Sequence, residues 1–272
     1  MELSDQLIVE QIQIGPMQNF AYLVGDRVSR EVVVVDPAWD IQGLLDLVNE
    51  RDYKLTGALL THYHPDHCGG SFGQNTVEGV SRLLEHVSLP IYANEHEAQG
   101  VIKVTGISET DLKKVSSGDK LRVGDIEIEF LHTPGHTPGC VSYQFDNAVF
   151  VGDTLFMPDT GTARCDFPGG SPILLYKSIE KLLSLPDCTR LYVCHDYPGD
   201  RRRNRCVTTV AEQKLANIHW RATTCADSFA ALRSQRDRTL APPRWQAISI
   251  PANLQCKDIG EIQVLLTQTM NE

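Results

Sequence analysis

The sequence predicts an α/β fold in which strands and amphipathic helices alternate along the chain. Short apolar or alternating runs that stop at Gly, Pro or Asp recur through the first 200 residues, a pattern typical of β-strands. Between several of these runs, apolar residues recur at helical spacing behind capping residues, which indicates helices that pack on a sheet. A chain of 272 residues, with 42% hydrophobic and 22% charged residues, is long enough to bury a large core.

The N-terminal half is rich in strands. Its apolar runs predict strands at residues 6–14, 21–24, 32–35, 55–60 and 90–93, and a helix at residues 80–86. Asp40 is placed to cap a further helix, because the residues behind it form an apolar stripe: Ile41, Leu44, Leu45 and Val48. This half therefore predicts a strand-rich unit with interleaved helices.

The second half repeats this order of strands followed by helices. Two-residue turns at 124–125 and 146–147 predict two hairpins, with strands at 120–123, 126–132, 141–145 and 148–151. Ser171 and Pro172 open a helix that ends before Pro186. Thr209 and Glu212 form a capping-box pattern at the start of another helix. Two more helices are predicted at residues 228–236 and 258–267.

Four side chains of metal-ligand type fall within six residues, and they dominate the functional interpretation. They are His62, His64, Asp66 and His67. His62 and His64 follow an apolar run, and on an extended chain a spacing of two points both rings the same way. Pro65 then breaks the strand and allows the last two to turn towards a second position. Imidazole and carboxylate together suit Zn, Fe or Mn, so this segment predicts a metal site.

Further candidate ligands stand at the ends of three later apolar runs. His136 lies in a Thr-Pro-Gly-rich loop, Asp153 follows Gly152, and His195 follows Cys194. Each of these residues by itself is more often a structural residue at a strand end. Taken together and in this order, they indicate that the metal site is completed from distant parts of the chain.

The four motifs resemble those of the metallo-β-lactamase superfamily over about residues 6–200. The resemblance implies a four-layer αββα sandwich with a metal cleft at one edge of two packed sheets. It also implies a first metal position held by His62, His64 and His136. The second position would be held by Asp66, His67 and His195, with Asp153 bridging the two. Residues 1–200 would form the catalytic domain. Residues 201–272 are more helical and polar, and we interpret them as an extension packed on that domain.

Within the superfamily, one group resembles this chain most in its loops. The segment 161–170 and the tripeptide 195–197 are similar to those of persulfide dioxygenases, which are related to glyoxalase II. Thr162-Ala163 departs from the usual Cys-Gly before Arg164. The resemblance implies one Fe(II) held by His62, His136 and Asp153. This ion and O2 would oxidise glutathione persulfide to sulfite and glutathione.

The remaining ligand-type residues would then support that iron ion from an outer shell. The residues expected to contribute to catalysis are Asp66, Arg164 and Tyr197, and the last two are also expected to bind substrate. Asp153 stands where the best-known zinc β-lactamases have Cys, which argues against antibiotic hydrolysis.

A hydrolase is the alternative in a different reaction class. Two Zn, Fe or Mn ions in the complete ligand set would generate a bridging hydroxide, because the metals lower the pKa of bound water. The substrate would be a thioester of the glyoxalase II kind. A binding protein without catalytic activity is a third possibility, which a complete ligand set disfavours.

The formal net charge of −10 argues against a nucleic-acid partner, since phosphate contacts need clustered Lys and Arg. One basic cluster exists, at residues 201–205. It is either a solvated loop or a site in which Arg201 and Arg203 hold the carboxylates of a small substrate such as glutathione.

Compartment and assembly are predicted from what the sequence lacks. The start of the chain shows no signal-peptide pattern, and no apolar run approaches the ~20 residues of a membrane span. Eight cysteines occur without a Cys-x-x-Cys pair, which favours reduced thiols. We expect a cytoplasmic protein without membrane contact, and a homodimer is possible. His132 is expected to be structural, and His86, His96 and His219 to be surface or helix residues without a functional partner.

Overall fold

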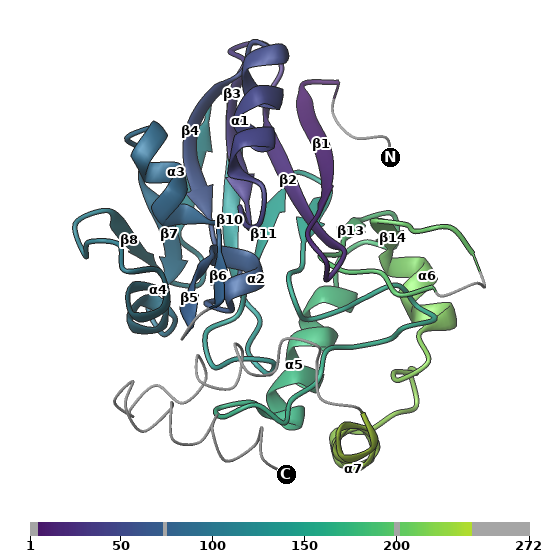
Figure 1. Ribbon diagram of the computed structural model, residues 1–272. Coiled ribbons are helices and arrows are strands. Elements are labelled where there is room, and N and C mark those ends of the chain that lie inside the picture. Colours follow the sequence, from purple (N-terminus) through teal and green to yellow (C-terminus); the bar gives the residue numbers. More distant parts are fainter. Residues whose placement is uncertain (1–4, 73–74, 199–201, 241–272) are drawn as a thin grey trace.

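The computed structural model describes residues 5–72, 75–198 and 202–240. Two six-stranded sheets form the body of the molecule, in the strand orders β1-β2-β3-β4-β7-β8 and β14-β13-β12-β11-β10-β9 (Figure 1). The first sheet comprises β1 (Leu7–Ile14), β2 (Asn19–Asp26), β3 (Glu31–Val35), β4 (Lys54–Leu59), β7 (Ile91–Asn94) and β8 (Leu112–Val115). The second comprises β9 (Lys120–Val123), β10 (Ile126–His132), β11 (Val141–Phe145), β12 (Ala148–Phe150), β13 (Arg190–Tyr192) and β14 (Val207–Thr209).

Helices accompany both sheets. They are α1 (Ile41–Glu50), α2 (Pro65–Cys68), α3 (Val80–His86), α4 (Ala98–Thr105), α5 (Pro172–Leu183), α6 (Val210–Ala216) and α7 (Ala226–Thr239). A small hairpin, β5 (Gly70–Phe72) and β6 (Asn75–Val77), follows α2. Figure 1 shows α1, α3 and α4 beside the first sheet and α5, α6 and α7 beside the second.

Side-chain alternation along the first sheet explains the layers. Tyr22 and Val24 of β2 belong to the large core that also contains Phe130 and Tyr143 of the second sheet. The intervening Leu23 points to the other face, where it joins the core under the helices α1, α3 and α4. Successive residues of a strand face opposite sides, so an apolar strand of this kind is buried on both faces. The architecture is the αββα sandwich that the sequence predicts.

Most predicted elements are confirmed within one to three residues. Both two-residue hairpins form, with Val123 paired to Ile126 and Phe145 paired to Ala148. The Asp40 side chain accepts a hydrogen bond from the Gly43 amide at the start of α1. The helices α2 and α4 and the strands β5, β6, β8 and β14 were not predicted. Gly100 interrupts the apolar pattern of α4, and the structure uses its missing side chain, because a Cβ there would meet the Tyr63 ring at 2.6 Å.

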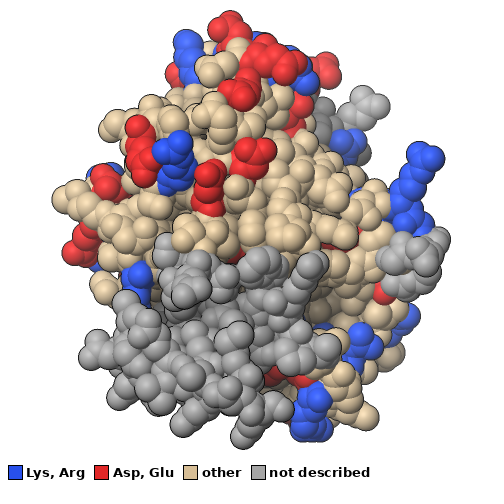
Figure 2. Space-filling view, viewed as in Figure 1, with Lys and Arg blue, Asp and Glu red and all other residues tan. Residues whose placement is uncertain are grey.

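The described part of the C-terminal region extends the second sheet. β14 pairs with β13, and Phe229 of α7 belongs to the large core. The boundary at residue 200 stays a prediction, and the helix predicted at residues 258–267 lies outside the described residues. Among the described helices, none is both long and apolar enough to span a bilayer. Figure 2 shows acidic and basic side chains interspersed on the upper part of one face.

Candidate metal centre

The predicted ligands converge at one edge of the two sheets. His62 and His64 lie in the segment between β4 and α2, and His67 lies within α2. The other three follow strands of the second sheet, namely His136 after β10, Asp153 after β12 and His195 after β13. Pro65 occupies the first turn of α2, where its missing N–H costs nothing, and so starts the turn that carries Asp66 and His67 back to the site.

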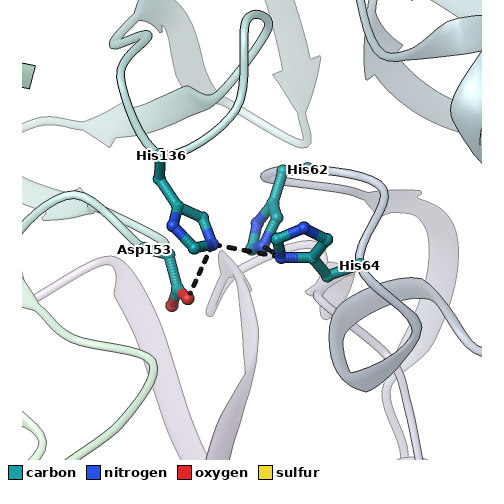
Figure 3. Close-up of side chains that lie close together, drawn as sticks. All are labelled: His62, His64, His136 and Asp153. Carbon is teal, nitrogen blue, oxygen red and sulfur yellow. Dashed lines mark hydrogen bonds and ion pairs between the residues drawn. The ribbon is translucent and has the colours of Figure 1, made fainter. Parts of the chain in front are cut away.

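A first group of donors surrounds one position. Nδ1 of His64 lies 2.9 Å from His62 Nε2 and 3.1 Å from His136 Nε2. His136 Nε2 lies 3.2 Å from Oδ2 of Asp153. Figure 3 shows these four side chains pointing toward one another, with His62 and His64 on one loop and His136 and Asp153 on two others. Their donor atoms all lie within 4.8 Å of one another.

A second group lies beside the first. Nε2 of His67 is 3.3 Å from Nε2 of His195, and Oδ2 of Asp66 is 3.4 Å from each of these nitrogens. Oδ1 of Asp153 is 3.6 Å from each of the same two nitrogens. The Cys194 thiol lies 2.7 Å from Asp153 Oδ1 and adds a sulfur donor to this group. The sequence did not suggest Cys194 as a ligand.

Asp153 is shared between the two groups. Its Oδ2 faces His136 and its Oδ1 faces His67 and His195, so the two oxygens of one carboxylate point to different donor sets. A carboxylate held in this way is placed to bridge two cations or to serve either one.

The donor set fits a metal ion. Bonds of ~2.0–2.2 Å in tetrahedral or octahedral geometry separate neighbouring donors by roughly 2.8–3.6 Å. The closest contacts here, from 2.9 to 3.6 Å, fall in this range. Five imidazoles and two carboxylates suit Zn, Fe or Mn better than Ca or Mg.

The remaining ring nitrogens of four histidines are occupied, which fixes their orientation. Nδ1 of His136 lies 2.8 Å from the Arg164 carbonyl, and Nδ1 of His195 lies 3.2 Å from the Met17 carbonyl. Nδ1 of His62 lies 3.0 Å from Thr61 Oγ1, and Nδ1 of His67 lies 2.9 Å from Asp36 Oδ2. Partners of this kind leave Nε2 for the metal and raise the basicity of the ligand.

Asp36 is a supporting residue that sequence reasoning missed. It accepts hydrogen bonds from the backbone N–H and the hydroxyl of Thr61, both at 2.7 Å, as well as facing His67. Its φ of 52° is in the left-handed region, which costs free energy in a residue other than Gly. The sequence signal for Asp36 was its position directly after β3 and before Pro37. A carboxylate at the end of a strand often contacts the other side chains that gather at that edge of the sheet.

Burial and charge set the protonation of the histidines. Burial, followed by neighbouring histidines, holds the pKa of His62 well below its ordinary value and lowers that of His64 to about 3. Burial also opposes protonation of His67, but the carboxylates of Asp66, Asp36 and Asp153 outweigh it and raise the pKa of His67. His62 and His64 are therefore neutral, the state in which imidazole binds a metal.

Glu97 links two motif loops and was also missed. It is fully buried, and its carboxylate accepts hydrogen bonds from Tyr63 N at 2.9 Å, Thr137 Oγ1 at 2.8 Å and Gly139 N at 2.7 Å. Tyr63 lies between two ligands, and Thr137 follows a third. Glu97 therefore sets the distance between the loops that carry His62, His64 and His136.

We expect Glu97 to make stability pH-dependent. Burial raises its pKa from 4.5 to about 7, although its hydrogen-bond donors oppose the shift. The stabilisation is complete below ~4.5 and is lost as pH rises through about 7, because the folded protein then holds a buried charge. Between pH 5 and 8 the free energy of unfolding should fall by roughly 2–3 kcal/mol more in the wild type than in Glu97→Gln. Urea titrations at these pH values measure this difference, and parallel pH profiles would rule it out. Glu95→Gln, an exposed neighbour, serves as the control.

A cavity of about 410 Å³ opens beside the metal centre. Its wall includes the ligands His64, Asp66, His136, Asp153 and His195. Tyr197 and Arg164, two of the predicted substrate residues, also line it. The Tyr197 ring stacks on the His195 ring, with centroids 5.5 Å apart, and its hydroxyl lies 3.4 Å from the Met17 carbonyl. The Arg164 guanidinium forms a two-point ion pair with Asp166 at 2.6 and 2.7 Å.

The described residues of the basic cluster, 202–205, do not line the cavity. Arg203 is exposed and is not among the lining residues, and Arg201 lies outside the described residues. Arg202 forms ion pairs with Asp159 at 2.6 Å and Asp196 at 2.5 Å. Its role in the structure is to tie two loops together.

His219 does not behave as a surface residue, and that expectation was wrong. It is only 6% exposed, lines the cavity and accepts a hydrogen bond from Thr162 N at 3.0 Å. Sequence reasoning missed it because Thr162, which donates to its ring, lies 57 positions earlier in the chain. His132 is structural as expected, with Nε2 3.0 Å from the Pro138 carbonyl.

Comparison with known proteins agrees with the geometry. Residues 14–195 match the family model described as the metallo-beta-lactamase superfamily. The chain is 36% identical over 229 residues to Glyoxylase B2 of Dictyostelium discoideum, covering 81% of this chain and 76% of that protein. It is 34% identical over 242 residues to human mitochondrial persulfide dioxygenase ETHE1, covering 88% of this chain and 84% of the relative.

A solved structure shows the same likeness in three dimensions. The crystal structure of ETHE1 from Myxococcus xanthus superimposes with a TM-score of 0.74 at 30% sequence identity. The superposition covers 92% of this chain and 99% of that one. The relatives thus carry names from two reaction classes at nearly equal identity.

Proposed function

The chain belongs to the metallo-β-lactamase superfamily and is a metal-dependent enzyme of that fold, and on this premise we propose that it is a persulfide dioxygenase. The proposed reaction takes one persulfide, one O2 and one water, and yields the thiol, sulfite and two protons. The observation that carries the proposal is the arrangement of His62, His136 and Asp153 Oδ2 around one position beside the cavity. Two imidazoles and one carboxylate form the ligand set typical of non-haem iron oxygenases.

Iron bound at this position would supply O2 activation next to the persulfide sulfur. The protein holds the three ligands by contacts outside the ion, through Thr61 for His62 and the Arg164 carbonyl for His136. In this proposal the other ligand-type residues, His64, Asp66, His67 and His195, orient water and neighbouring side chains around the centre.

Two cavity residues are proposed to handle the substrate. Tyr197 lines the cavity, and its hydroxyl, 3.4 Å from the Met17 carbonyl, is placed to donate a hydrogen bond to a bound sulfur or oxygen. Arg164 positions the substrate and, through its backbone carbonyl, the ligand His136. The substrate we propose is glutathione persulfide, in line with the likeness to a persulfide dioxygenase.

A thioester hydrolase is the second candidate, and one observation favours it. The second donor group is complete, and Asp153 Oδ1 faces it. Two ions held in this way would supply a hydroxide nucleophile at neutral pH. The likeness to Glyoxylase B2 supports this candidate at 36% identity.

The deciding experiment measures O2 uptake by protein loaded anaerobically with Fe(II) and given glutathione persulfide. Metal content is determined on the same sample. We expect rapid uptake with about one iron per chain, as a single facial ligand set requires. Absence of uptake with two metals bound would refute the dioxygenase, and a panel of glutathione thioesters would then test hydrolysis.

A further inference from the structure

The cavity has two ends of opposite chemical character. The carboxylates among its lining residues, Asp66 and Asp153, both belong to the metal centre. Away from the metals the described lining contains three arginines, Arg164, Arg233 and Arg236, and no acidic residue. A substrate that fills this cavity would therefore meet the metals at one end and positive charge at the other.

Two polar groups at the positive end lack partners among the described residues. His219 Nε2 and Thr160 Oγ1 are buried atoms without a hydrogen bond, and both residues line the cavity. The Thr162 amide donates to His219 Nδ1, so the neutral ring carries its proton on Nε2. Burial, with Arg233 and Arg236, lowers the pKa of His219 to about 3, which keeps this state at physiological pH. A buried donor without an acceptor is costly, and such groups often await a ligand.

Contacts from α7 hold the loop that carries Thr160. Arg233 is buried on α7, pairs with Asp237 at 2.6 Å and donates to the Thr162 carbonyl at 3.1 Å. Asp237 in turn accepts from the Cys165 amide at 3.0 Å. The Arg233 guanidinium is therefore used in contacts within the protein. Arg236 lies one turn further along the same helix and is exposed.

We propose that His219, Thr160 and Arg236 form an anion subsite that binds a carboxylate of the substrate, remote from the sulfur that reacts at the metal. This inference rests on the proposed function for the identity of the substrate as a glutathione derivative. It replaces the basic cluster at residues 201–205 as the recognition site. The guanidinium supplies charge, and the imidazole N–H and the hydroxyl supply direction.

Binding without turnover tests the subsite. The probe is S-methylglutathione, a thioether that is neither a persulfide nor a thioester, titrated by calorimetry into the Zn(II)-loaded protein. Arg236→Gln should raise its Kd about tenfold, the usual effect of losing a charge-assisted hydrogen bond. Thr160→Val, which keeps the side-chain shape, should raise Kd by roughly threefold to tenfold. Replacement of His219 is avoided, because its Nδ1 also holds the loop.

The control variant is Arg238→Gln. Arg238 is exposed, two residues further along α7, and does not line the cavity. Two analogues of the probe, each with one carboxylate converted to a carboxamide, identify the bound group. For one of these analogues, Arg236→Gln should not raise the Kd any further, because the carboxylate that Arg236 would bind is already absent.

Three results would overturn the subsite: an unchanged Kd in Arg236→Gln, an equal loss in Arg238→Gln, or no binding of the probe to the wild type. Failure of the subsite is distinct from failure of the dioxygenase. O2 uptake together with unchanged binding in Arg236→Gln rejects the subsite alone. Arg236-dependent binding without O2 uptake keeps the subsite and rejects the dioxygenase.

Discussion

Asp153→Ala is expected to abolish metal binding and activity together. Among the described residues, Asp153 is the one carboxylate that faces both donor groups, with Oδ2 3.2 Å from His136 and Oδ1 3.6 Å from His67 and His195. Its loss removes a ligand from both groups and leaves the first group, His62, His64 and His136, without a carboxylate. We expect kcat/KM to fall at least about a thousandfold, since the metal supplies several kcal/mol of transition-state stabilisation.

Metal analysis on the purified variant, combined with the O2 uptake assay, measures this effect. Asp187→Asn is a suitable control, because Asp187 is exposed and forms a surface ion pair with Lys214. Full metal occupancy in Asp153→Ala would contradict the assignment of Asp153 as a ligand. Normal metal content with lost activity would instead give it a role in the reaction alone.

His136→Ala and His67→Ala are expected to differ sharply. In the mononuclear proposal His136 holds the iron, so its removal should eliminate iron and O2 uptake. His67 belongs to the second group, so its variant should retain about one iron and lose roughly 10–100-fold in activity, as outer-shell changes usually do. The difference follows from their positions, since His136 faces Asp153 Oδ2 and His67 faces Asp153 Oδ1.

His132→Ala is the matched control. His132 lies four residues before His136, and its ring is hydrogen-bonded to the Pro138 carbonyl. Equal and complete loss of activity in His136→Ala and His67→Ala, with retained thioester hydrolysis in the wild type, would favour the two-metal hydrolase. A His67→Ala protein that still hydrolyses thioesters at the wild-type rate would contradict the two-metal hydrolase.

The second donor group has a structural meaning whichever reaction is catalysed. Without metal, His67 is surrounded by Asp36, Asp66 and Asp153, which raise its pKa. Metal ions bound at the centre would place positive charge beside the same three carboxylates. The stability of the loops that carry the ligands therefore depends on how the charges of the centre are balanced.

Local sequence patterns were sufficient for most strands and helices. The hairpins at 124–125 and 146–147 and the caps at Asp40, Ser171 and Thr209 depend on neighbours within a few residues. The helix α4 was not predicted, because Gly100 interrupts its apolar pattern. The reason for a glycine there is close packing against the ring of Tyr63, which lies 37 positions earlier in the chain. Contacts over such separations leave no periodic signal in one sequence.

The sequence by itself determined the fold family and the residues that converge on the metal centre, because their types and order at strand ends are unusual. Only the tertiary structure decided which atoms face each other. It assigned the two oxygens of Asp153 to two donor groups, placed Asp36 and Glu97 behind the ligands, and moved His219 from the predicted surface to the cavity wall. The physical reason is that ligand geometry and burial arise from packing between distant segments, whereas strand and turn preferences are local.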